Sequence, residues 1–161
     1  MKINIFGSTG HIGKLCLNLI DSSFNNIKVN LLCADQNLSL LIKQINKYKP
    51  RYVYLNNEDK SKELMLKVKG KTKVLTFGEL NNYLYNSKSN LSLLAVSGIK
   101  SLNYLEPIIK NTENLGLVSK EAVVSAGHLF KKLKIYKKTN IFPIDSEHFS
   151  LYSYFNSNTK N

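Results

Sequence analysis

Apolar residues follow two alternating patterns along the chain. Residues 3–6 alternate and then run apolar, and the run at 91–96 is typical of a strand buried on both faces of a sheet. Between such runs, apolar residues such as Ile12, Leu15 and Leu19 recur three or four positions apart, which is typical of a helix packed on a sheet. The pattern therefore predicts strands that alternate with helices.

This alternation predicts the fold class. We expect strands at residues 3–6, 27–34, 52–55, 73–76, 91–96, 115–118 and 140–144. We expect helices at residues 12–20, 38–48, 59–68, 78–86, 101–110 and 120–136, the last one long. Such an order is typical of a Rossmann-like, doubly wound α/β fold with a mainly parallel sheet and helices on both faces. Ligands bind such folds at the carboxyl ends of the strands.

Composition narrows the class of protein. A chain of 161 residues with 43% hydrophobic residues is the size of one domain. The net charge of +12 comes from 22 Lys and one Arg scattered along a chain that also has 20 Asn, which we interpret as compositional bias. We interpret the lysine cluster at 131–138 as a solvated face at the end of a helix. We therefore expect neither a nucleic-acid nor a membrane partner. Cys16 and Cys33 sit in apolar segments without a CxxC motif. With no secretory or membrane-spanning segment in the sequence, we expect a reduced, cytoplasmic protein.

A glycine-rich turn follows the first predicted strand. Gly7, Gly10 and Gly13 form GxxGxxG where the strand meets a helix. Glycines let a pyrophosphate approach the backbone, and the helix N-terminus attracts its charge, so the position favours a dinucleotide site. The alternative is a tight turn with no ligand. Ser8 and His11 are placed to donate to phosphate oxygens or to water.

Asp35 ends the second predicted strand. A carboxylate at this place accepts hydrogen bonds from a ribose 2′-hydroxyl, whereas a basic residue pairs with a 2′-phosphate. Asp35 and the neutral Gln36 therefore lean toward NAD. The alternative, about equally supported, is that Asp35 caps the helix that begins near Asn37.

Ser119, Lys120 and Glu121 connect a buried strand to a helix. Ser119 suits an N-cap and Glu121 suits a first helical turn, so capping explains much of this pattern. Lys120 opposes the helix dipole there, and we expect it to have an anionic or carbonyl partner. We interpret His128, further along, as a packing residue.

Asp145 and Glu147 flank Ser146 directly after the last predicted strand. Two residues apart in extended backbone, the carboxylates would point to one side and could hold Mg²⁺ or Mn²⁺, with Ser146 free to meet a substrate. The alternative is that Asp145 is an N-cap and Glu147 lies in the first turn of a short helix. His148 is expected beside them or facing solvent.

Four segments together resemble one enzyme family. FGSTGHIG, PRYVYL, SKEAVVSAGHLF and FPIDSEHF occur in the order seen in 1-deoxy-D-xylulose 5-phosphate reductoisomerases, and the chain resembles their N-terminal, NADPH-binding part over nearly its whole length. The resemblance implies an NADPH- and Mg- or Mn-dependent oxidoreductase that rearranges and reduces 1-deoxy-D-xylulose 5-phosphate to 2-C-methyl-D-erythritol 4-phosphate in the non-mevalonate route to isoprenoids.

The resemblance also implies roles for individual residues. For the cofactor it implies contacts from Gly7, Thr9, Gly10, His11, Ile12, Gly13, Asp35, Gln36, Asn37, Ser119 and Glu121; for the substrate from Lys120, Ser146 and Glu147; and for the metal from Asp145 and Glu147. No residue of this chain is implied to be catalytic. Two positions depart from the family, which usually has Gly-Lys or Gly-Arg in place of Asp35-Gln36 and Asn in place of Ser119. The first departure makes NADH a possible cofactor.

Family members continue into a catalytic domain and a C-terminal helical domain. We therefore expect residues 1–148 to form the dinucleotide-binding domain, and 149–161 to begin the connection to a catalytic domain or to fray as a tail. We expect this chain alone to bind nucleotide without turnover, and the family to be homodimeric with a phosphorylated sugar as substrate. The alternatives are another Rossmann-type NAD(P)-dependent reductase and a non-enzymatic nucleotide-binding module.

Overall fold

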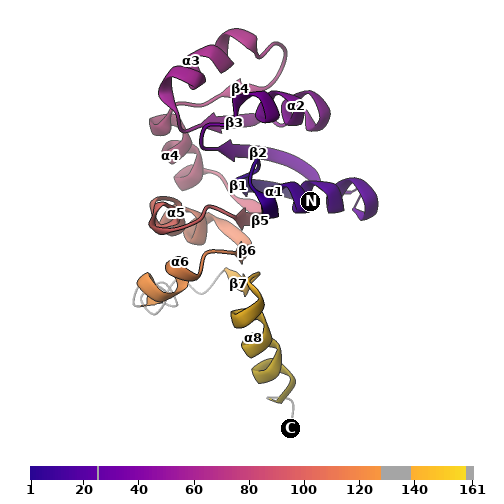
Figure 1. Ribbon diagram of the computed structural model, residues 1–161, viewed down its shortest axis with the longest axis vertical. Helices are drawn as coiled ribbons and strands as arrows, with labels where there is room; N and C mark the ends of the chain where they lie inside the picture. The colour runs from indigo at the N-terminus through magenta and orange to yellow at the C-terminus, as the bar shows by residue number, and fades with distance from the viewer. Residues whose placement is uncertain (25, 128–138, 159–161) are drawn as a thin grey trace.

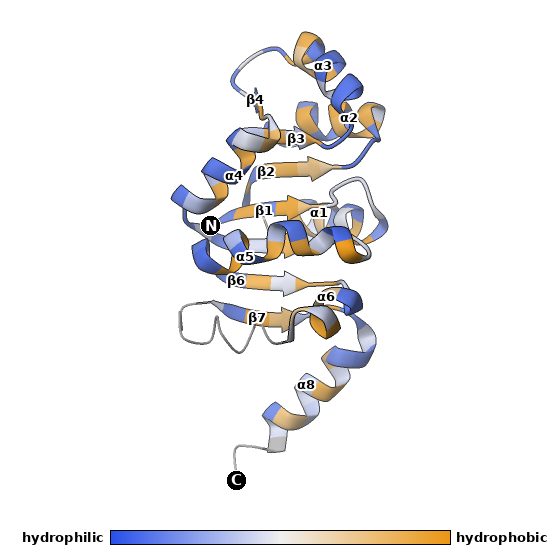
Figure 2. Ribbon diagram, turned by 90° about the vertical axis from the view of Figure 1, so that its left-hand side faces the viewer, coloured by the Kyte–Doolittle hydropathy of each residue, from blue (hydrophilic) through white to orange (hydrophobic). Residues whose placement is uncertain are grey.

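The described part of the chain folds around one parallel sheet. A computed structural model describes residues 1–24, 26–127 and 139–158. Its seven-stranded sheet has the order β4-β3-β2-β1-β5-β6-β7, and every neighbouring pair is parallel. Figure 2 shows the strands side by side with their arrowheads at one edge. The order reverses between β1 and β5, which is where ligands bind in doubly wound sheets.

The elements have the following bounds. The strands are β1 (Lys2–Phe6), β2 (Lys28–Ala34), β3 (Tyr52–Leu55), β4 (Lys73–Val74), β5 (Ser89–Leu94), β6 (Thr112–Leu117) and β7 (Asn140–Pro143). The helices are α1 (His11–Ser23), α2 (Leu38–Tyr48), α3 (Glu58–Lys67), α4 (Phe77–Asn86), the short 3₁₀ helix η1 (Ile99–Ser101), α5 (Leu102–Asn111), α6 (Lys120–Ser125) and α8 (Ser146–Asn158). The predicted Rossmann-like class is confirmed.

Helices cover both faces of the sheet and create two hydrophobic cores. Ile3 and Ile5 of β1 pack toward the side that carries Leu17 of α1 and Leu41 of α2. Phe6 points to the opposite side, where α4, α5 and α6 contribute apolar side chains. Figure 1 shows α1 and α4 on opposite sides of the sheet. Alternate β1 side chains thus serve different cores, as expected for a strand buried on both faces.

A polar cluster lies inside the second core, between the sheet and α4. Asn30 Nδ2 donates to Asn4 Oδ1 at 3.1 Å and to the Tyr83 hydroxyl at 2.6 Å. Asn4 and Asn30 are both buried. The register of β1 on β2 shifts beside this cluster, from Ile3 opposite Val29 to Asn4 opposite Leu31, so that Asn30 is the additional residue of a β-bulge. The hydrogen bonds satisfy amides that burial would otherwise penalise.

Most predicted elements agree with the structure within two or three residues, with one clear exception. The long helix predicted at 120–136 is wrong in its described part, because α6 ends at Ser125 and Ala126 leaves the helical conformation at φ −100° and ψ 8°. His128 and the lysines at 131–138 lie outside the described residues. Helix α5 continues through Pro107 to Asn111.

Helix α8 follows β7 and extends away from the sheet, as Figures 1 and 2 both show. Its side chains Phe149, Leu151, Tyr154 and Phe155 are each more than half exposed. Among the described residues, no helix has the length and apolar content that a bilayer crossing requires.

Candidate nucleotide-binding site and carboxylate cluster

The glycine turn is shaped by close backbone approaches. Gly7 has φ +84°, and a Cβ there would lie 2.4 Å from Ala95 O, so only glycine fits. The amides of Gly7 and Ser8 both donate to Cys33 O at 2.9 Å, which fixes the turn to the end of β2. At Gly13, a Cβ would lie 2.3 Å from Gly7 O. Helix α1 therefore begins in direct contact with the turn.

The N-terminus of α1 is open to a ligand. Gly10 is its N-cap residue and has no side chain with which to cap the first turn. The first amides of any helix lack partners within the helix, and here they belong to His11, Ile12 and Gly13. No acidic residue lies in this first turn. The end of α1 can therefore donate hydrogen bonds to a phosphate, as predicted for the GxxGxxG motif.

A buried amide holds the turn from the other side. Gln44 of α2 is 5% exposed and Ser8 is fully buried. The Ser8 hydroxyl donates to Gln44 Oε1, and Gln44 Nε2 donates to the carbonyl oxygen of Ser8, each at 2.8 Å. These paired bonds restrain both the side chain and the backbone of Ser8. The glycine turn is thus fixed to β2, α1 and α2 together.

A pocket of about 600 Å³ lies at the carboxyl ends of the strands, where the strand order reverses. Six of the predicted cofactor residues line it: Gly7, Thr9, Gly10, Asp35, Gln36 and Asn37. The loop after β5 supplies Ala95, Val96 and Ser97 to the opposite wall. A pocket of this size, bordered by the glycine turn, suits a nucleotide.

Asp35 is not the cap of α2. Asn37 is the N-cap, because its Oδ1 accepts a hydrogen bond from the Leu40 amide at 3.1 Å. Asp35 Oδ1 instead accepts from Asn56 Nδ2 at 2.8 Å, which orients the carboxylate at the rim of the pocket. The helix-cap interpretation of Asp35 is therefore wrong. Its carboxylate remains available to a ligand.

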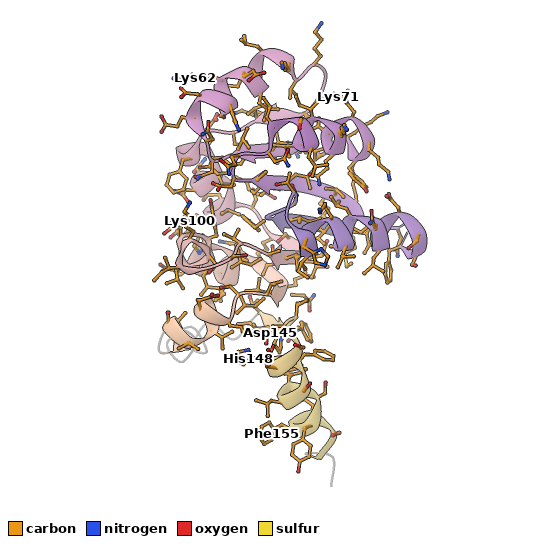
Figure 3. All side chains as sticks on the ribbon, in the orientation of Figure 1. Lys62, Lys71, Lys100, Asp145, His148 and Phe155 are labelled. Atoms are coloured by element: carbon orange, nitrogen blue, oxygen red, sulfur yellow. The ribbon has the colours of Figure 1, made fainter. Side chains whose placement is uncertain are left out.

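Several residues that line this pocket were not predicted from the sequence. Lys100 and Asn103 enter the pocket from η1 and α5, and Asn56 from the end of β3. Figure 3 labels Lys100 on the side of the sheet that carries α5. The rule that ligands lie beyond strand carboxyl ends could have identified the loop after β5, because it directly follows a predicted strand.

Ser119 caps α6, as predicted. Its Oγ accepts a hydrogen bond from the Ala122 amide at 3.2 Å and donates to Glu121 Oε2 at 2.9 Å. The backbone amide of Glu121 and the Ser119 hydroxyl lower the pKa of the Glu121 carboxyl. Ser101 Oγ also lies 3.3 Å from Ser119 Oγ, which joins the loops after β5 and β6. Ser119 and Glu121 are not among the residues that line the 600 Å³ pocket.

Lys120 has the anionic partner that was predicted for it. Its Nζ donates to Glu147 Oε1 at 2.5 Å, and the pair joins α6 to α8. The ammonium of Lys120, with a further bond from the Ser146 hydroxyl, holds the pKa of Glu147 at about 2. Glu147 in turn raises the pKa of Lys120. Both side chains are more than half exposed, so this pair adds little to stability.

Asp145 is the N-cap of α8. Its Oδ1 accepts from the His148 amide at 2.9 Å and lies 2.8 Å from His148 Nδ1. Glu147 accordingly lies in the first turn of α8, so the extended backbone expected for this pair is wrong and the capping alternative is confirmed. Figure 3 shows Asp145 and His148 together at the start of the helix.

The second oxygen of Asp145 is a candidate metal ligand. Asp145 Oδ2 is buried, and it is the one such side-chain atom without a hydrogen-bond partner among the described residues. A buried carboxylate oxygen without a donor is suited to bind a cation. Within the same described part of the chain, no group of three or more His, Cys, Asp or Glu side chains converges as a complete metal site. Asp145 Oδ2 therefore fits one ligand of a divalent-cation site, whereas the two oxygens of Glu147 already contact Lys120 and Ser146.

Comparison with known proteins places these features in one family. Residues 3–127 match the family model described as 1-deoxy-D-xylulose 5-phosphate reductoisomerase. The chain is 36% identical over 165 aligned residues to the reductoisomerase of Pelagibacter ubique, with 99% of the chain and 42% of the relative covered. It is 38% identical over 157 residues to that of Wigglesworthia glossinidia brevipalpis, with 94% and 39% covered.

A solved structure agrees. The reductoisomerase from Zymomonas mobilis in complex with NADPH superposes with a TM-score of 0.82 at 23% identity, over 91% of this chain and 39% of that one. The chain thus spans about two fifths of the length of the curated relatives that it matches. The glycine turn and the point between β1 and β5 where the strand order reverses fall within residues 3–127. The chain belongs to the 1-deoxy-D-xylulose 5-phosphate reductoisomerase family.

Proposed function

We propose that this chain is the dinucleotide-binding part of a 1-deoxy-D-xylulose 5-phosphate reductoisomerase and that NADPH is its cofactor. The observation that carries the proposal is the pocket that brings the glycine turn and the segment Asp35–Asn37 together, although these segments are more than twenty residues apart in sequence. Reductoisomerase structures of the same fold were solved with NADPH and with fosmidomycin and magnesium. Residues 1–148 would form the cofactor domain.

The residues divide into two groups by location. The turn at Gly7, Thr9 and Gly10 and the first amides of α1, from His11, Ile12 and Gly13, would bind the pyrophosphate. Asp35, Gln36 and Asn37 would surround the adenosine ribose. Ser119 and Glu121 would approach the cofactor from the start of α6, where their mutual hydrogen bond sets their orientation.

The cluster at α6 and α8 would serve the substrate and the cation. Asp145 and Glu147 would hold Mg²⁺ or Mn²⁺, with Asp145 Oδ2 as the oxygen that has no other partner among the described residues. A bound divalent cation supplies Lewis-acid polarisation of carbonyl and hydroxyl oxygens of a substrate. Lys120 and Ser146 would bind the phosphorylated sugar, and both already contact Glu147. A low pKa keeps Glu147 ionised for either partner.

Thermal stabilisation by cofactor tests the proposal. Ligand at about one hundred times its Kd stabilises a protein by about 2.7 kcal/mol, which for a chain of this size raises the melting temperature by about 5–10 °C. We expect NADPH to produce such a shift. The control is Gly7→Ala, whose Cβ would collide with Ala95 O and which should lose the shift, so both proteins are first compared by circular dichroism. Absence of any shift with NADPH or NADH would refute the proposal.

Binding of Mn²⁺, followed by electron paramagnetic resonance, tests the metal assignment separately. We expect Asp145→Asn to weaken Mn²⁺ binding about tenfold or more, as loss of a ligand does. Asp59→Asn removes a carboxylate that is 94% exposed on α3 and serves as the control with unchanged binding. Equal binding by both variants would refute the assignment of Asp145.

A further inference from the structure

We propose that Lys60, assisted by Lys43, binds the 2′-phosphate of NADPH and gives this chain its preference for NADPH over NADH. The inference rests on the proposed cofactor site and names the residues that discriminate within it. By charge, Asp35 and Gln36 favour the 2′-hydroxyl of NADH. A preference for NADPH therefore needs a positive charge from elsewhere in the fold.

Lys60 lies in the first turn of α3 and reaches back to the end of β2. Its Nζ donates to the carbonyl oxygen of Gln36 at 3.0 Å. Gln36 directly follows Asp35, the residue that marks the ribose 2′ position in such folds. The contact therefore holds an ammonium group one residue from the carboxylate that would contact the 2′-hydroxyl. A phosphate on that oxygen would meet the ammonium of Lys60.

A second hollow adjoins the cofactor pocket at this point. Gln36 and Asn37 line both, so the two hollows meet at the segment that follows Asp35. The second hollow has a volume of about 850 Å³, and its walls carry three lysines: Lys43 from α2, and Lys60 and Lys67 from α3. The excess of lysines over the one lining carboxylate, Glu63, suits an anionic group such as a phosphate.

The three lysines are not equally available. Lys67 Nζ forms an ion pair with Glu63 Oε1 at 2.5 Å, which neutralises it. Within the described part of the chain, Lys43 and Lys60 have no carboxylate within ion-pair distance. Glu58 and Asp59 share the first turn of α3 with Lys60, but neither lines the cofactor pocket or the second hollow. Of the two carboxylates that do line them, Glu63 is paired with Lys67, which leaves Asp35 against the ammonium groups of Lys43 and Lys60.

The orientation of Asp35 is compatible with a ribose that carries either a 2′-hydroxyl or a 2′-phosphate. Asn56 Nδ2 donates a hydrogen bond to Asp35 Oδ1, and this bond offsets part of the negative charge of the carboxylate. A 2′-phosphate carries about two negative charges near neutral pH. The repulsion from Asp35 is therefore smaller than the attraction from Lys43 and Lys60. The basic group that would bind the 2′-phosphate thus comes from α3 and not from the residue that follows Asp35.

Paired titrations test the inference. The full chain and its variants are titrated with NADPH and NADH, and with adenosine 2′,5′-bisphosphate and AMP, by calorimetry at low salt. We expect the wild type to bind NADPH more tightly than NADH. Because Lys60→Ala removes a charge-assisted hydrogen bond to the phosphate, it should weaken NADPH binding about tenfold or more and leave NADH binding unchanged. Lys60→Gln should behave like Lys60→Ala.

Lys71→Ala supplies the matched control. Lys71 is an exposed lysine in the loop after α3 and lines neither hollow. Figure 3 shows it apart from Lys100, which borders the pocket. Its loss removes the same charge and should leave the ratio of NADPH to NADH affinity unchanged. Adding salt should reduce the NADPH advantage of the wild type more than that of Lys60→Ala.

The outcomes separate the two proposals. If NADPH and NADH both bind and Lys60→Ala leaves their affinity ratio unchanged, the lysine assignment is overturned while the cofactor site stands. A wild type that prefers NADH overturns it also. If neither dinucleotide nor either adenosine probe binds, the proposed cofactor site fails and this inference fails with it. Selective loss of NADPH and bisphosphate binding supports it.

Discussion

A Gly13→Ala substitution adds one methyl group where α1 approaches the glycine turn. The new Cβ would lie 2.3 Å from Gly7 O, 2.7 Å from Ser8 Cα and 2.9 Å from Ser8 C. All three are backbone atoms of the turn, so no side-chain rotation can relieve the contact. Either α1 or the turn must move, and the turn is held by Cys33 O and by Gln44.

The magnitude follows from two opposing effects. Forcing extra atoms into a packed interior costs about 1–3 kcal/mol, and three backbone contacts place Gly13 at the upper end. Alanine is better than glycine inside a helix by about 1 kcal/mol. We expect Gly13→Ala to destabilise the fold by about 2 kcal/mol, which lowers the melting temperature by about 4–8 °C.

Gly78→Ala is the matched control. Gly78 is also a helical glycine, in the first turn of α4, but a Cβ there would meet no atom within 4 Å. The same added methyl group should therefore stabilise the fold by about 0.5–1 kcal/mol. Urea unfolding followed by circular dichroism measures both variants. The reasoning is refuted if Gly13→Ala is as stable as the wild type, or if the two substitutions change stability in the same direction.

Three further predictions concern side-chain contacts. Gln44→Leu leaves Ser8 without its buried partner, so the free energy of unfolding measured in urea should fall by about 1–3 kcal/mol, and NADPH affinity should fall with it. Unchanged values for both would contradict the role of this amide. In metal-free buffer, NMR titration should find Glu147 ionised down to about pH 2, because the ammonium of Lys120 favours the charged carboxylate. The Lys120→Ala variant should return the pKa of Glu147 toward the ordinary carboxyl range. A wild-type pKa already in that range would contradict the ion pair. Any stability that this pair adds is present above the ordinary Glu pKa and is lost as pH falls toward 2. Thr76→Ala removes the capping box of α4 and should destabilise the protein by about 1 kcal/mol in the same urea assay, with no loss counting against the cap.

The sequence predicts the fold well because its strands are buried on both faces. The run 31–34 is apolar without alternation, and only a sheet covered by helices on both sides buries it. The glycine turn was identifiable because a strand, three glycines and a helix follow one another locally. Boundaries such as the end of α6 were missed because apolar spacing continues beyond Ser125.

The parts of the site that were missed depend on packing between distant segments. Lys60 meets Gln36 across 24 positions, and Ser8 meets Gln44 across 36. Neither pair forms a local motif. The pair Asp145 and Glu147 was placed correctly after β7, and of the two conformations left open the structure has the helical one, in which Asp145 caps α8 through the His148 amide. Extended and helical continuations have the same sequence signature until that bond is seen.

The buried cluster of Asn4, Asn30 and Tyr83 has a consequence at the carboxyl ends of β1 and β2, where the glycine turn lies. Because Asn30 is the additional residue of the bulge, the cluster sets how far β2 extends beyond β1. Without the bulge, β2 would slide by one residue, or about 3.3 Å, and Cys33 O would no longer meet the amides of the glycine turn. Well-packed apolar replacements could preserve or raise the stability of the sheet. They would do so while misaligning the two halves of the ligand pocket, so thermal stability and ligand affinity can be changed independently from this one point.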